Sequence, residues 1–152
     1  MSALPEGRLS IAEAGSLGDY LFLRRLRNQV RRLMTNDTRP ISLWRQFRFF
    51  LHMRNGENAS QLRIFIARYG SHRAGYLLVR SGGGEVSITE AVDEKFRRQG
   101  IAEELIAFAQ VRYPAIIAEI KEDNLASIAL HVAMGFEFEE KRERIVVYRF
   151  RR

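Results

Sequence analysis

The sequence predicts a mixed α/β domain with a largely antiparallel sheet. Three observations indicate this class. Short apolar strand patterns follow one another directly in the middle of the chain, helical patterns lie before and after them, and two more strand patterns close the chain. The chain has 152 residues, of which 46% are hydrophobic and 28% charged, so we expect one globular domain covering residues 1–152.

The first third of the chain predicts one strand and two helices. The strand is expected at residues 8–12, and the helices are expected at residues 17–33 and 42–53. Opposite a row of arginines, the apolar side of the first helix is expected to hold Leu21, Leu26, Val30 and Leu33. In the second helix, Leu43, Phe47, Phe50 and Leu51 occur at helical spacing and are expected to form its apolar side.

Three strand patterns follow with no helical pattern between them. Residues 62–68 and 73–80 are joined by residues 69–72, whose sequence Tyr-Gly-Ser-His is typical of a hairpin turn. A third strand pattern at residues 85–92 follows the glycine run 82–84. This part of the sheet is therefore expected to be antiparallel.

After residue 100 the pattern changes to an alternation of helix and strand. Helical spacing begins at Ile101 and continues until Pro114, which stops a helix. Residues 115–120 form a short, nearly unbroken apolar run, which predicts a strand buried on both faces. The helix before this strand is expected to be a crossover connection.

The end of the chain predicts one more helix and a final strand pair. Asn124 is a suitable helix cap, and Gly135 is a suitable glycine after the helix end. Residues 136–139 and 145–150 predict two antiparallel strands.

The chain is strongly basic, with a net charge of +7 and a pI of about 10.3. Much of this charge lies in residues 24–32, 39–54 and 149–152. Arginine rows on helices are usually solvated faces, and no helix-turn-helix, zinc-finger or RNP-type pattern accompanies them. The sequence therefore disfavours nucleic-acid binding and favours an anionic small ligand.

Composition excludes several kinds of site. The chain has no cysteine, which excludes disulfides, thiolate catalysis and cysteine-ligated zinc. Its histidines are few and scattered (His52, His72 and His131), so no metal site is expected. Residues 1–10 lack the apolar stretch of a signal peptide, and no apolar run approaches the roughly 20 residues of a membrane span. We therefore expect a cytoplasmic protein with no membrane partner.

The most informative segment is residues 92–102, which joins a predicted strand to the start of a helix. Unpaired N–H groups and the positive end of the helix dipole bind anions at such a turn. Gly100 lets the backbone approach a ligand closely, and Ala102 keeps the first helical turn uncrowded. Arg97 and Arg98 add positive charge, so a diphosphate is the expected ligand.

Two segments of the sequence resemble signatures of the GNAT acetyltransferases. Arg97-x-x-Gly100-x-Ala102 resembles the Q/R-x-x-G-x-G/A pyrophosphate loop, and residues 124–136 resemble the later signature N-x-x-S/A-x-x-L-Y-x-x-x-G-F. The resemblance implies a GNAT fold, with a splayed central sheet of about seven strands flanked by about four helices. It also implies an N-acetyltransferase that uses acetyl-CoA as co-substrate.

The resemblance assigns cofactor-binding roles to two groups of residues. Backbone groups of Ala91 and Val92 are expected to bind the pantetheine arm, with Asn124 and Ser127 along the CoA chain. Asn124 is equally suited to be only a helix cap. The diphosphate is expected to lie against Arg97 and the N–H groups of Arg98, Gln99, Gly100, Ile101 and Ala102.

In GNAT enzymes a neutral amine attacks the thioester directly, which requires a base for the amine and an acid for the leaving thiolate. The tyrosine that usually acts as acid is replaced here by His131, which is either the acid or a packed helix residue. For the base, the resemblance favours Glu119, which matches a strand glutamate of the ribosomal-protein alanine N-acetyltransferases. Glu90 is the rival, and either glutamate is equally able to pair with an arginine.

The acceptor is expected to bind to the N-terminal third. Residues 27–34 loosely resemble the R-N-x-x-V-R-x-x-M pattern of GNAT members that acetylate nucleotide-linked amino sugars, as in pseudaminic acid biosynthesis, but shortened by one residue. On this reading Arg27, Asn28 and Arg31 contact a sugar-nucleotide diphosphate, and Trp44 stacks on a base. The alternative is a basic amphipathic helix with a packed tryptophan.

Three functions are therefore compared. The first is a small-molecule N-acetyltransferase with an amino-sugar acceptor, and the second is a protein N-terminal or lysine acetyltransferase. The third is a non-catalytic module that binds acyl-CoA or nucleic acid. A homodimer is compatible with the sequence, which identifies no surface for it.

Overall fold

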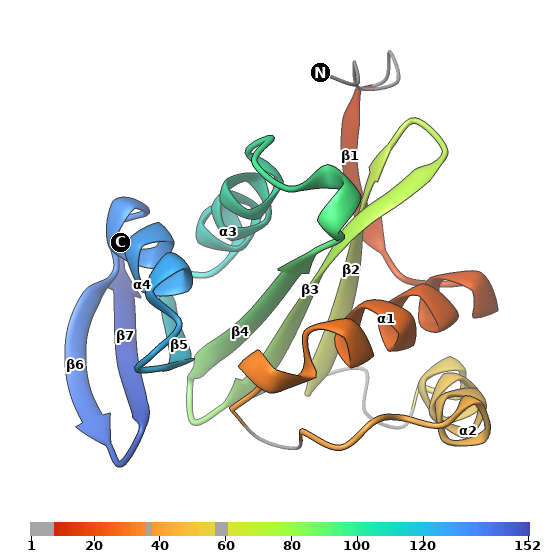
Figure 1. Ribbon diagram of the computed structural model, residues 1–152, viewed down its shortest axis with the longest axis horizontal. Coiled ribbons are helices and arrows are strands. Elements are labelled where there is room, and N and C mark those ends of the chain that lie inside the picture. The colour runs from red at the N-terminus through yellow and green to blue at the C-terminus, as the bar shows by residue number, and fades with distance from the viewer. Residues whose placement is uncertain (1–7, 36–37, 57–60) are drawn as a thin grey trace.

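The computed structural model describes residues 8–35, 38–56 and 61–152, through which runs one seven-stranded sheet with the order β1-β2-β3-β4-β5-β7-β6 (Figure 1). The strands are β1 (Leu9–Glu13), β2 (Leu62–Tyr69), β3 (His72–Gly82), β4 (Glu85–Val92), β5 (Ala115–Lys121), β6 (Glu137–Arg142) and β7 (Ile145–Arg151). The α-helices are α1 (Leu17–Gln29), α2 (Leu43–Arg54), α3 (Ile101–Arg112) and α4 (Leu125–Ala133). Two 3₁₀ turns are η1 (Arg31–Leu33) and η2 (Glu94–Phe96). No helix in this part of the chain is long and apolar enough to cross a membrane.

The helices cover the two faces of the sheet, and alternate residues of each strand face one layer or the other. On one face α1 packs over β3 and β4, in an apolar cluster that also contains Ile64 and Ile66 of β2. On the other face α3 packs against Phe65 and Ala67 of the same strand. This alternation matters below, because it decides on which side of the sheet each candidate catalytic residue lies.

Helix α1 is anchored to the sheet through Asp19. Ser16 and Asp19 form a capping box at the helix start, in which each side chain accepts a hydrogen bond from the other residue's N–H group. The buried Asp19 carboxylate also pairs with Arg68 of β2 and Arg73 of β3. Burial acts to raise the pKa of Asp19, but these hydrogen bonds and charges outweigh it and lower the pKa.

The first helix ends earlier than its pattern predicts. Helix α1 stops at Gln29, Val30 is its C-cap, and the 3₁₀ turn η1 follows. Leu26 and Val30 are buried as expected, whereas the expected core residues Leu21 and Leu33 are exposed. Besides Leu26 and Val30, the buried apolar residues of this segment are Tyr20, Phe22 and Leu23.

Helix α2 buries a different side from the one that its pattern suggests. Tyr20 of α1 explains the orientation, because its ring packs edge to face against Phe49 and Phe50. Its carbonyl also accepts a hydrogen bond from the buried side chain of Gln46. The residues of the predicted apolar side that remain exposed are Leu43, Phe47 and Leu51.

The sheet opens between β4 and β5. These strands form the only parallel pair among the described strands, and the pairing includes just Val86 with Ile116 and Ser87 with Ile117. Strand β4 continues to Val92 and β5 to Lys121 without further pairing between them. The splayed sheet that the sequence resemblance implied is therefore present.

The apolar run at residues 115–120 predicted a strand buried on both faces, but β5 is not buried on both. Ile116, Ala118 and Ile120 are buried, whereas Glu119 is exposed. The reason is the opening between β4 and β5, because the outward-facing side of β5 borders a cleft instead of a packed layer.

Glycine at position 75 is expected to allow β3 and β4 to pack closely beside this opening. A methyl group there would lie 2.7 Å from the Ala91 carbonyl oxygen and 3.4 Å from a methyl carbon of Leu105. We expect Gly75→Ala to lower the free energy of unfolding by about 1–3 kcal/mol, measured by urea denaturation. The matched control is Gly82→Ala in the same strand, where nothing lies within 4 Å of the added methyl group. Equal stability of the two variants would contradict the proposed close packing.

Candidate active site

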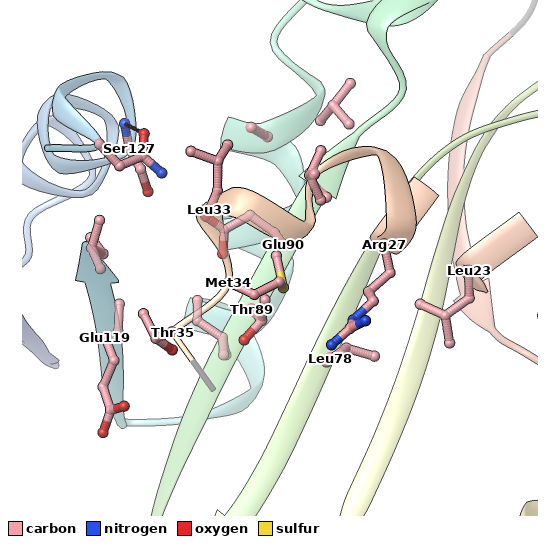
Figure 2. Close-up of a pocket in the computed structure, with 18 of the residues that line it drawn as sticks. Leu23, Arg27, Leu33, Met34, Thr35, Leu78, Thr89, Glu90, Glu119 and Ser127 are labelled. Carbon is pink, nitrogen blue, oxygen red and sulfur yellow. Dashed lines mark hydrogen bonds between the residues drawn. The ribbon is translucent and has the colours of Figure 1, made fainter. Parts of the chain in front are cut away.

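A cleft of about 640 Å³ passes between the parted strands β4 and β5 (Figure 2). The side chains that line it come from α1, α2 and α4 as well as from strands β2 to β5. Its size is that of a site for a small molecule or a cofactor. Figure 2 shows Glu90 on β4 and Glu119 on β5, the two strands that border the cleft.

One end of the cleft reaches the N-terminus of α3. Gly100 is the N-cap of α3, with φ of 76°, a left-handed conformation that suits glycine, and no side chain caps the helix. The first N–H groups of the helix therefore have no intrahelical acceptor and can bind an anion. Asp93 holds the preceding loop, because its carboxylate accepts hydrogen bonds from the Lys95 N–H group and from Arg25 of α1.

The structure divides the predicted cofactor residues into three groups. Those that line the cleft are Ala91, Val92, Arg97, Ala102, Asn124 and Ser127. Gln99 and Gly100 line a second cavity of about 460 Å³ beside β1. Ile101 is buried in the core, and Arg98 is exposed with φ of 62°.

Helix α4 contributes a cap and a buried histidine. The Asn124 side chain accepts a hydrogen bond from the Ser127 N–H group at 3.3 Å, so Asn124 is the helix cap and also borders the cleft. His131 lies one turn after Ser127, and its Nδ1 is 2.7 Å from the Ser127 carbonyl oxygen. Because only N–H can bind that carbonyl, Nδ1 carries a proton.

The other ring nitrogen of His131 faces Glu90. Nε2 lies 3.2 Å from the Glu90 carboxylate, and the two side chains are 2% and 9% exposed. The geometry of this contact is that of an ion pair and not of a regular hydrogen bond, and both residues line the cleft. A neutral ring would turn a lone pair toward the carboxylate, whereas a protonated ring turns a positive N–H group toward it.

The pKa of His131 is raised above its ordinary value. Burial acts to lower the pKa, because a charged ring loses hydration. The interaction with the nearby Glu90 carboxylate, together with the Ser127 carbonyl, outweighs this effect. The imidazolium form of His131 is therefore stabilised beside the cleft.

The two candidate glutamates lie on opposite faces of the sheet. Glu90 pairs across the strands with Leu77 and so points toward the α3 and α4 layer, where Leu77 is buried. Glu119 follows Ala118 and precedes Ile120, which are buried in that same layer, and so it points to the α1 face. The sequence treated these residues as rivals for one role, but they occupy different environments.

On the α1 face three arginines line the cleft: Arg27 of α1, Arg45 of α2 and Arg80 of β3. Arg27 also donates a hydrogen bond to the Arg39 carbonyl. Only Arg27 was predicted from sequence. The available signal for Arg80 was its alternation with Leu78, which places both side chains on one face of β3. Arg45 was one of many arginines in its segment, and nothing local distinguished it.

The other predicted acceptor residues lie outside the cleft. The Asn28 side chain exchanges two hydrogen bonds with the backbone of Ile41, at 2.8 and 3.0 Å, and so holds the chain just before α2. Arg31 belongs to the η1 turn and does not line the cleft. Trp44 is largely exposed on α2, on a side that does not border the cleft.

Comparison with protein families gives one match, in which the model of the GNAT acetyltransferase family covers residues 24–136. Comparison with curated proteins gives no match. The solved structures that resemble the chain share its fold at low sequence identity. They include an N-acetyltransferase from Staphylococcus aureus Mu50, which is 18% identical with a TM-score of 0.75, over 95% of this chain and 98% of that chain.

Two further solved structures resemble the chain over nearly its whole length. Ribosomal-protein-alanine N-acetyltransferase from Brucella melitensis is 20% identical with a TM-score of 0.72, over 94% of this chain and 99% of that one. PaiA N-acetyltransferase from Thermoplasma acidophilum, in complex with coenzyme A, is 9% identical with a TM-score of 0.76, over 95% and 99%. These similarities confirm the fold that the two sequence signatures predicted.

The pairing of Glu90 with His131 predicts a measurable shift. In Glu90→Gln the negative charge that stabilises the imidazolium is lost, so the pKa of His131 should fall. The measurement is an NMR titration of the histidine ring signals. The matched control is Glu140→Gln on the exposed strand β6, in which the His131 signals should titrate as in the parent protein. An unchanged pKa of His131 would show that the two side chains do not interact in solution.

Proposed function

The chain belongs to the GNAT family of acetyltransferases, and from this premise we propose that it transfers acetyl from acetyl-CoA to the amine of a small anionic acceptor. The observation that carries the proposal is the division of the cleft into two chemical sides. A buried histidine and its glutamate partner lie on one side, and an exposed glutamate and three arginines lie on the other.

The cleft has the parts that acetyl-CoA requires. Where β4 leaves β5, the backbone groups of Ala91 and Val92 have no partner on β5 and can bind the amides of the pantetheine arm. The uncapped N-terminus of α3, together with Arg97, provides donors and positive charge for the diphosphate. Ser127 also lines the cleft, one helical turn before His131.

Glu119 is the proposed base. It lies on the α1 face with the three arginines, on the side from which we propose that the acceptor enters. Its carboxylate accepts the proton that the amine loses, directly or through a water molecule, as the amine nitrogen bonds to the acetyl carbon. Its exposure leaves it accessible to such a water before the acceptor binds.

His131 is the proposed acid, and Glu90 is proposed to position it. As the bond between the acetyl carbon and sulfur breaks, Nε2 of His131 donates its proton to the thiolate. The ring becomes neutral and keeps its Nδ1 hydrogen bond to Ser127. Glu90 does not act as the base in this scheme, because its carboxylate already stabilises the charged histidine.

Three arginines line the α1 side of the cleft, which favours an acceptor that carries several negative charges. Guanidinium groups bind phosphate oxygens through paired hydrogen bonds, and each has more donors than one contact uses. A nucleotide-linked amino sugar has such a diphosphate and a free amine. It is therefore the proposed acceptor class, in preference to a protein, whose extended peptide would need an open groove.

The proposal predicts selective stabilisation by acetyl-CoA. At a concentration about a hundredfold above Kd, acetyl-CoA should raise Tm by about 5–10 °C, measured by differential scanning fluorimetry.

Glu119→Gln should keep this shift of Tm with acetyl-CoA but lose about 10²-fold or more in turnover with an accepted amine. The matched control is Glu140→Gln on the exposed strand β6, which should turn over normally. No shift with acetyl-CoA or CoA would remove the proposal, and equal turnover in the two variants would remove Glu119 as base.

The acid role of His131 predicts the alkaline limb of the pH profile. A donor with a raised pKa is protonated below that pKa, so kcat should fall as the pH rises through it. Glu90→Gln lowers the pKa of His131 and should move the limb to lower pH, parallel to the NMR titration. A limb that stays in place would exclude His131 as the group that limits kcat.

A further inference from the structure

Helix α2 carries an apolar surface that no described part of the chain covers. Leu43, Trp44, Phe47 and Leu51 are 60%, 68%, 38% and 40% exposed, and we call these four residues the α2 ridge. The helix lies at the periphery of the molecule, beside α1 and far from α3 and α4 (Figure 1). Single exposed apolar residues are normal on a protein surface, but four on one side of one helix form a patch.

Helical geometry separates α2 into three sides. With about 100° between successive residues, the ridge covers an arc of about 100°. The side that packs against the protein is centred on Gln46, Phe49, Phe50 and Met53. The remaining side is basic and holds Arg45, Arg48 and His52. The exposed residue Arg54 continues the ridge at its C-terminal end.

The charged residues of the segment that carries the ridge have one sign. From Arg39 to Gly56 the sequence contains four arginines and no aspartate or glutamate. Exposed tryptophan, phenylalanine and leucine beside arginines are typical of helices that lie in the interface of a membrane. Anionic headgroups attract the arginines, while the acyl boundary accepts the apolar side chains.

Other partners fit this surface less well. A second copy docked through the same face would bring two arginine-rich helices together, and their positive charges would repel each other. A peptide needs a groove, yet no residue of the ridge lines either the cleft or the second cavity, and the ridge is the convex side of a helix.

We propose that α2 docks the protein on an anionic lipid surface, with the ridge inserted among the headgroups and Arg48 and Arg54 against lipid phosphates. The residues of α2 that line the cleft are Arg45, Gln46 and Phe49, on nearly the opposite side of the helix. The docked protein therefore keeps its cleft open to solvent. The expectation of no membrane partner rested on the absence of a spanning segment, which surface docking does not require.

Trp44 makes the proposal directly measurable, because it is the only tryptophan of the chain and belongs to the ridge. Its fluorescence should shift to shorter wavelength on addition of vesicles of phosphatidylcholine containing about one-third phosphatidylglycerol. Vesicles of phosphatidylcholine alone should produce little shift, and high salt should weaken the effect. This readout does not depend on acetyl transfer, so its failure and the failure of the proposed function are distinguishable.

Two variants separate the apolar and the charged contributions. Phe47→Ser should weaken vesicle binding about tenfold or more, and Arg48→Gln should weaken it about fivefold, in vesicle titrations followed through Trp44. The matched control is Val111→Ser, which changes an even more exposed apolar residue on α3 and should bind as the parent does.

Three outcomes would overturn the proposal. The first is the absence of a fluorescence shift with anionic vesicles at low salt. The second is equal binding by Phe47→Ser, Arg48→Gln and the control. The third is a shift that appears without lipid and grows with protein concentration, since it would show that a second copy covers the ridge.

Discussion

The early end of the β4–β5 pairing is the constraint on which the rest of this structure depends. A parallel pair that stops after two residue pairs leaves backbone N–H and C=O groups of both strands without sheet partners. Such groups need other partners, and the extended arm of a bound co-substrate can provide them. The same separation lets α4 bring His131 against β4 and leaves Glu119 facing an open cleft.

The alternation of side chains along the strands then divides the chemistry between two faces. A carboxylate on the α3–α4 face is buried beside a histidine, and one on the α1 face is exposed beside arginines. These environments suit different tasks. Glu90 favours the protonated form of His131, whereas Glu119 is placed where it can accept a proton from an acceptor amine. Two glutamates that are equivalent in the sequence pattern thus acquire separate proposed roles.

Helix α2 shows how one sequence pattern supports two orientations. Its apolar residues occur on two sides of the helix, and Tyr20 selects the side that contains Phe49 and Phe50. The four remaining apolar residues are then left on the surface next to basic residues. Hydrophobic spacing reports that a helix has an apolar side, but burial depends on the surface that the helix meets.

The sequence by itself determined the order of strands and helices, the hairpin at residues 69–72, the cap at Asn124 and the glycine turn before α3, because these features rest on local periodicity and backbone preference. It also determined the family, through two signatures in the correct order. Only the tertiary structure decided that Glu90 meets His131, that Arg45 and Arg80 join Arg27, and that Asn28 and Trp44 lie away from the cleft. Those arrangements join residues far apart in the chain, and their geometry follows from strand register and helix packing, which local sequence does not specify.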